Sequence, residues 1–139
     1  MSNESFTLSL KSTFEESERI PSFVEDLQSK SSLNEEESST LMLLLSEAVT
    51  NAIEHGNLND EAKNVDVQIV IDDKKITTTV TDEGEGFDPS TLKDPLKEEN
   101  LLATGGRGIF LIRELSDEIE FEDDGRTIRF AIHRNNTGS

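Results

Sequence analysis

The stretch from Leu41 to Gly56, LMLLLSEAVTNAIEHG, decides the fold and carries the first candidate chemistry. Its apolar side chains recur at spacings of three and four residues, which predicts one amphipathic helix with a stripe that packs against a sheet. The stripe is formed by Leu41, Leu44, Leu45, Ala48, Ala52 and Ile53. Glu47 and Asn51 fall between these positions, and side chains four residues apart stack on a helix. We therefore expect a carboxylate and a carboxamide side by side at the rim of the stripe, where a base and a metal ligand can share one edge.

Two glycine-rich stretches downstream give this pair its significance, because a Glu and an Asn four residues apart are by themselves typical of a solvated helix face. The residues from Asp82 to Gly86, DEGEG, follow a strand-like run, where a simple turn is the alternative interpretation. The residues from Gly105 to Gly108, GGRG, open a second apolar helix. Free N–H groups at a helix start receive phosphate oxygens, and glycine keeps side chains out of the way. The second stretch therefore predicts a phosphate-binding segment.

Three blocks of sequence, SEAVTNAIEHGN, DEGEGFDP and GGRGIFLI, stand in this order along the chain. Together they resemble the Bergerat-type ATP-binding fold that histidine kinases, gyrase and Hsp90 share, the GHKL family. The resemblance is closest to a small stand-alone branch, the anti-sigma factors that are serine/threonine protein kinases. It extends from about Phe6 to Ile132 and implies a histidine-kinase-like ATPase domain with ATP and Mg²⁺ as cofactors.

The resemblance also implies a role for each matching residue. The residues that it places at the nucleotide are Asn51, Asp82, Gly84, Gly86, Thr104, Gly105, Gly106, Arg107, Gly108 and Thr127. Asp82 is expected to accept a hydrogen bond from the adenine amine, and Thr127 to help it hold an adenine-bound water. Asn51 is expected to bind Mg²⁺ through its neutral oxygen, while Glu47 orients or deprotonates the substrate hydroxyl. Arg107 is expected to contact either a phosphate or a protein partner.

Composition restricts the class of protein. The 139 residues are sufficient for one domain, 1–139, and the absence of Cys excludes disulfides, thiolate metal sites and thiol catalysis. The net charge of −17 would repel a nucleic-acid backbone, so an acidic surface serves either solubility or a basic protein partner. No apolar run approaches the roughly 20 residues that cross a bilayer, and the first residues lack the pattern of a secretory signal. We therefore expect a cytoplasmic protein that binds neither membranes nor nucleic acids directly.

The periodicity of the apolar residues predicts an α+β fold, a two-layer sandwich in which helices cover one face of a mostly antiparallel mixed sheet. In chain order the expected elements are a strand at Ser5–Leu10, a helix from about Glu15 to Lys30 that restarts or kinks at Pro21, the central helix with a capping box of Asn34 and Glu37 that runs to His55, and a hairpin from Val65 to Val80. A segment at about 87–104 has no clear element, which is typical of a functional lid or of disorder, and the resemblance implies that it is the ATP lid. A helix that ends near Ser116 and a hairpin from Ile119 to Ile132 follow.

These features lead to two hypotheses about function. By resemblance, the chain is an anti-sigma regulatory factor that phosphorylates a serine of an anti-anti-sigma (STAS-type) partner. It otherwise sequesters a sigma factor, usually as a homodimer. The alternative is a non-catalytic module that uses ATP to order its lid and holds a regulatory protein. Arg19 is interpreted as a local ion pair or, by resemblance, as a partner contact, and His55 as a histidine favoured by the helix dipole rather than as a catalytic group.

Overall fold

Alternating apolar residues assemble five strands into one sheet, as shown in the computed structural model, which describes residues 4–84 and 106–134. The strands are β1 (Glu4–Lys11), β2 (Asn64–Ile71), β3 (Lys75–Thr81), β4 (Glu118–Glu122) and β5 (Thr127–His133). Their order in the sheet is β1-β2-β3-β5-β4, so the first strand lies at an edge. Every pairing among the described strands is antiparallel, so this part of the sheet is antiparallel throughout rather than mixed.

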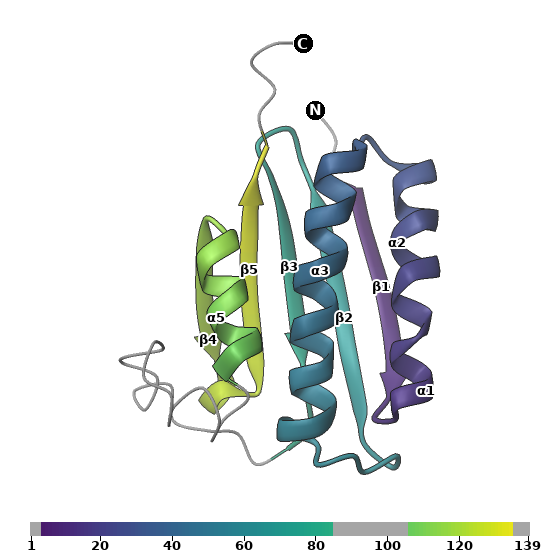
Figure 1. Ribbon diagram of the computed structural model, residues 1–139, viewed down its shortest axis with the longest axis vertical. Coiled ribbons are helices and arrows are strands. Elements are labelled where there is room, and N and C mark those ends of the chain that lie inside the picture. The colour runs from purple at the N-terminus through teal and green to yellow at the C-terminus, as the bar shows by residue number, and fades with distance from the viewer. Residues whose placement is uncertain (1–3, 85–105, 135–139) are drawn as a thin grey trace.

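The helices all lie on one face of this sheet, which confirms the predicted two-layer α+β fold (Figure 1). They are α1 (Phe14–Ser17), α2 (Arg19–Lys30), α3 (Glu35–Asn51) with the π-helical turn η1 (Ala52–Gly56), and α5 (Gly106–Leu115); a short 3₁₀ turn, η3 (Asp123–Gly125), joins β4 to β5. Pro21 occupies the first turn of α2, where its missing N–H has no helical partner to lose. The first helical segment therefore begins again near Pro21, which was one of the two expected outcomes, and the other was a kink.

The central helix α3 begins and packs as its sequence predicts. The Asn34 side chain accepts a hydrogen bond from the Glu37 N–H at 2.8 Å, and the Glu37 carboxylate accepts one from the Asn34 N–H at 3.1 Å. This reciprocal pair is a capping box that satisfies two donors at the helix start. All members of the predicted apolar stripe are buried: Leu41, Leu44, Leu45, Ala48, Ala52 and Ile53. They pack on inward-facing residues of the sheet such as Ile69, Val80 and Phe130.

The last turn of the central helical segment is wider than an α-helix. The Asn57 N–H donates to the Ala52 carbonyl oxygen at 2.8 Å, which closes the π-helical turn η1. A single π turn inside a helical segment commonly occurs at a functional site. Within the described part of the chain, no helix is long and apolar enough to cross a membrane.

Arg134 connects several segments at the end of the sheet where β1 begins and β5 ends (Figure 1). Its guanidinium donates to the two carboxylate oxygens of Glu37 at 3.0 and 3.1 Å, and to the carbonyl oxygens of Asp72 and Ser32, each at 2.9 Å. The Arg134 and Glu37 side chains are only 6% and 12% exposed. This buried ion pair therefore connects the residue after β5 to the capping box of α3.

The substitution Arg134→Ala is expected to lower the free energy of unfolding by about 3 kcal/mol, because it leaves the Glu37 carboxylate buried without its partner. A urea titration followed by circular dichroism measures this loss. Arg19→Ala is the control, since Arg19 makes an exposed local ion pair with Glu16 at 3.1 Å, as one interpretation of this residue predicted. Equal losses in the two variants would contradict a special role for the buried pair.

Candidate functional site

Three chain segments meet at the end of the sheet where β3 ends, opposite the end where β5 ends (Figure 1). The helix α3 ends there in the turn η1, the strand β3 ends there at Thr81, directly before Asp82, and the helix α5 begins there. The predicted residues Glu47, Asn51, Asp82 and Gly108 belong to these segments. This end of the two-layer fold is therefore the candidate site.

The helix α5 packs directly on Glu47. A Cβ atom built on Gly108 would lie 3.0 Å from one carboxylate oxygen of Glu47, which is tighter than most real contacts, and 3.6 Å from the Glu47 Cβ atom, which is an ordinary contact. Gly108 thus allows the first turn of α5 to approach α3 at the level of Glu47. Among the residues that the structure describes, the Glu47 carboxylate makes no hydrogen bond or ion pair. The predicted carboxylate and the predicted helix start are therefore adjacent, and no residue in the described ranges engages the carboxylate.

One turn beyond Glu47, the Asn51 side chain has a buried oxygen without a partner. Its Oδ1 atom is inaccessible to solvent and accepts no hydrogen bond from any residue that the structure describes. Buried acceptors are almost always satisfied in native proteins, so this atom fits a ligand position for a cation. In the described ranges no cluster of three or more His, Asp or Glu residues surrounds a metal position. This donor set suits Mg²⁺, which commonly takes one or two protein oxygens and completes its shell with phosphate oxygens and waters.

Asp82 is held at the end of β3 with its carboxyl group buried. The residue is 8% exposed, and its Oδ1 atom accepts a hydrogen bond from the Gly84 N–H at 2.8 Å. Its own N–H donates to the Arg126 carbonyl oxygen at 2.9 Å, which extends the ladder between β3 and β5. Burial raises the pKa of the Asp82 carboxyl, although the Gly84 N–H and the Arg126 guanidinium act in the opposite direction. The site therefore presents a desolvated acceptor.

Two glycines enclose this carboxyl group. A Cβ atom on Gly56 would lie 2.3 Å from a carboxylate oxygen of Asp82, and one on Gly84 would lie 1.8 Å from the carbonyl oxygen of Gly56. Contacts this short do not occur for real Cβ atoms. Side chains at these two positions are therefore excluded by the close approach of the turn η1 to the segment after β3.

The substitution Asp82→Asn is expected to raise the free energy of unfolding at neutral pH. Because the folded-state pKa of Asp82 is raised, its contribution to stability is full where the carboxyl is protonated and is lost as the pH rises through that pKa. Asparagine is uncharged at every pH and keeps an acceptor for the Gly84 N–H. The difference in free energy of unfolding between the variant and the wild type should therefore disappear as the pH falls below the ordinary Asp pKa of 3.8. Urea titrations at both pH values measure the difference, and a variant less stable than the wild type at neutral pH would contradict this account.

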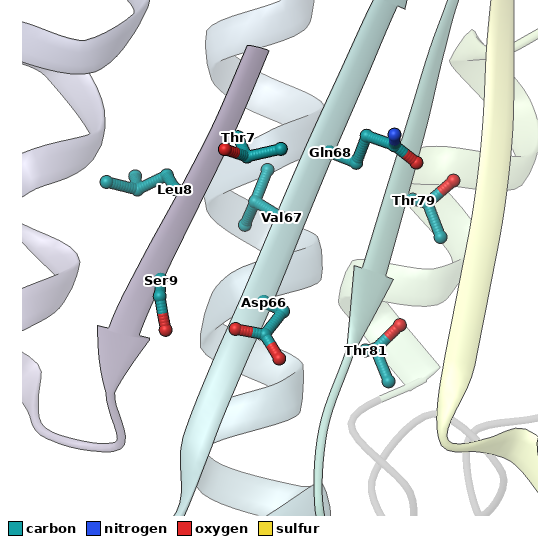
Figure 2. A pocket seen from close by; sticks show the side chains of 8 residues that line it. All are labelled: Thr7, Leu8, Ser9, Asp66, Val67, Gln68, Thr79 and Thr81. Carbon is teal, nitrogen blue, oxygen red and sulfur yellow. The ribbon is translucent and has the colours of Figure 1, made fainter. Parts of the chain in front are cut away.

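Thr127 lies on the opposite face of the sheet from Asp82. It pairs with Thr81 across β3 and β5, and the two hydroxyl oxygens are 3.2 Å apart. Figure 2 shows Thr81 and Thr79 lining a groove on the open face, with the sheet in front of the helices. Asp82 contacts Gly56 on the helix face instead. Because neighbouring residues of a strand point to opposite faces, the structure does not bring Thr127 to Asp82.

Several predicted residues lie outside what the structure describes. They are Gly86, Thr104, Gly105 and the lid at about 87–104. Gly106 and Arg107 belong to the first turn of α5, but the Arg107 side chain is not described. His55 is exposed in the last turn of the central helical segment, as expected for a histidine at a helix end.

Two residues of the site were not predicted. Arg126 donates through Nε to the Gly84 carbonyl oxygen at 2.6 Å, and Asn57 accepts a hydrogen bond from the Glu83 N–H at 2.8 Å. The pattern of Gly56 followed by Asn57 was interpreted only as a helix stop. The full burial of a polar side chain directly after a helix can be seen only once the strands are assembled.

Comparison with known proteins agrees with this arrangement. Residues 10–132 match the histidine kinase-like ATPase domain family. The chain is also 36% identical over 94 residues to the serine-protein kinase RsbW of Staphylococcus aureus strains JH9, Newman and USA300. Each alignment covers 62% of this chain and 59% of the relative, so the chain spans about three fifths of the length of these curated relatives.

Proposed function

Because this chain belongs to the family of histidine kinase-like ATPase domains, we propose that it is a serine protein kinase that uses ATP and Mg²⁺. The observation that carries this proposal is the buried, unpartnered Oδ1 atom of Asn51, one helical turn beyond the unengaged carboxylate of Glu47. A metal ligand and a proton acceptor at this spacing can support phosphoryl transfer, which depends mainly on positioning and on neutralisation of charge. The name of the similar relatives, serine-protein kinase, supports serine as the acceptor.

The nucleotide is proposed to lie between the turn after β3 and the start of α5. The Asp82 carboxylate accepts a hydrogen bond from the exocyclic amine of adenine, and Gly56 and Gly84 leave no side chain beside that carboxylate. The first N–H groups of α5 receive phosphate oxygens at the positive end of the helix. The contact between Gly108 and Glu47 supports this placement, since it sets the helix start beside the proposed base.

Glu47 is the proposed general base of the transfer. It takes the proton of the serine hydroxyl while the bond from the serine oxygen to the γ-phosphorus forms and the bond to the bridging oxygen breaks, which releases ADP. Asn51 holds the metal ion, and bound Mg²⁺ supplies positive charge that neutralises the phosphate oxygens. The support for this role is the absence of any hydrogen bond or ion pair at Glu47 among the described residues.

The proposed acceptor is a serine of an anti-anti-sigma (STAS-type) protein. The chain otherwise holds a sigma factor as a homodimer, so phosphorylation changes which partner is bound and thereby regulates transcription. The net charge of −17 supports protein partners rather than direct contact with nucleic acid.

Incubation of the purified protein with Mg²⁺ and γ-labelled ATP tests the proposal, first alone and then with each candidate STAS-type protein. We expect Mg²⁺-dependent label on a serine of one candidate. ATP binding with no label on any candidate would favour the non-catalytic binding module. Failure to bind ATP would contradict the site assignment itself.

A further inference from the structure

The Asn57 side chain joins three strand ends beside the proposed adenine site. Its Nδ2 group donates to the Ser12 hydroxyl at 2.8 Å and to the Asn64 carbonyl oxygen at 3.0 Å. Its Oδ1 atom accepts the Glu83 N–H at 2.8 Å. Asn57 is 1% exposed, and its carboxamide forms hydrogen bonds through both Nδ2 and Oδ1. It is therefore a buried amide with partners on both of its polar atoms.

The bond to Glu83 acts on the residue directly after Asp82. On one side, Asp82 and Gly84 are bonded to Arg126, through the backbone N–H of Asp82 and the carbonyl oxygen of Gly84. On the other side, the Asn57 carboxamide and the adjacent Gly56 hold the same segment. The Asp82 side chain therefore lies between two fixed attachments. The Asn57 carboxamide holds the backbone N–H of Glu83, while the Glu83 side chain is held separately, since its carboxylate accepts a hydrogen bond from the Asn64 N–H.

We propose that Asn57 is a positioning residue that fixes Asp82 for adenine and thereby sets the preference of the site for a 6-amino purine over a 6-oxo purine. The inference rests on the proposed binding of ATP. An exocyclic amine donates to a carboxylate, whereas a 6-oxo group places a second acceptor against it. The loss of affinity for a 6-oxo purine depends on a carboxylate that cannot move. If the Asp82 carboxylate is displaced, it loses the hydrogen bond from the amine of adenine, and it also escapes the repulsion of a 6-oxo group, so the difference in affinity between the two purines becomes smaller.

The test compares the dissociation constants of ATP and inosine triphosphate, both with Mg²⁺, measured by isothermal titration calorimetry. Wild-type protein is expected to prefer ATP by roughly 100-fold. Asn57→Ala is expected to reduce this preference by about 10-fold, mainly through weaker ATP binding. Equal weakening of both triphosphates, or an unchanged ratio, would overturn the proposal and leave Asn57 with a structural role only.

Two further variants separate positioning from stability. Ser12→Ala removes a partner of the Asn57 Nδ2 group but leaves the acceptor for Glu83, so the network is weakened while the ratio should stay within about 2-fold of the wild type. Asn57→Asp also keeps that acceptor, so it should retain the preference for ATP even if the fold is less stable. Loss of the preference in folded Asn57→Asp protein would contradict the proposal. Wild-type protein that binds neither triphosphate would instead refute the proposed function.

Discussion

Asn51→Ala protein is expected to lose Mg²⁺-dependent ATP binding by about 10³-fold, or about 4 kcal/mol, while remaining as stable as the wild type. The Asn51 Oδ1 atom is buried and accepts no hydrogen bond from residues 4–84 and 106–134, so its removal takes away a desolvated oxygen rather than an interaction with this part of the protein. If this oxygen instead served the fold, the substitution would lower the free energy of unfolding. Calorimetry with ATP, with and without Mg²⁺, and a urea titration measure the two quantities on the same preparation.

Ser38→Ala is the matched control for this experiment. Ser38 lies on the same helix, and its hydroxyl oxygen is also buried without a hydrogen-bond partner. It lies away from the site, in a groove between α2 and α3 with Val24 and Met42. Its substitution should leave ATP binding unchanged and the free energy of unfolding equal or higher. A comparable loss of ATP affinity in both variants would show that Asn51 does not act as a metal ligand.

The fold was predictable because its information is local. Spacings of three and four residues define the buried stripe of α3, and strict alternation defines strands such as β2 and β3. The capping box of Asn34 and Glu37 can also be recognised from four consecutive residues of the sequence. By contrast, the π turn at Ala52–Gly56 has no such signature, and the helix was expected to continue regularly to His55.

The candidate site was predictable only in part, because some of its contacts join distant segments. Glu47 and Asn51 follow from helical spacing, but Asn57 contacts residues 45 and 26 positions away in sequence, and Arg126 contacts Gly84 across 42 positions. No local pattern carries such pairings. Thr127 is a different case. Ile128 faces the core, and neighbouring residues of a strand point to opposite faces, so the sequence already places the Thr127 side chain on the face of β5 away from the core. The two-residue period of the strand was therefore the sequence signal that places the Thr127 side chain on the face opposite Asp82.

Glu47→Gln protein is expected to bind ATP as the wild type does but to transfer phosphate about 10³-fold more slowly, within the range for loss of a general base. Glutamine has the same shape, so the packing against Gly108 is preserved, but its amide does not accept a proton at neutral pH. A reduced rate with unchanged ATP affinity means that the lost interaction belongs to the transition state. Single-turnover transfer of γ-label to the partner serine measures the rate, and calorimetry measures ATP binding.

Glu54→Gln is the control that separates base catalysis from a change in net charge. Glu54 lies exposed in the turn η1, so this variant removes one negative charge close to the site without touching the proposed base. A general electrostatic effect on ATP would act in both variants, whereas a proton-acceptor role affects only Glu47→Gln. Transfer at the wild-type rate by Glu47→Gln protein would exclude Glu47 as the base. In that case the phosphoryl transfer would depend on the positioning of the nucleotide and the metal alone, which is the remaining way for this site to act as a kinase.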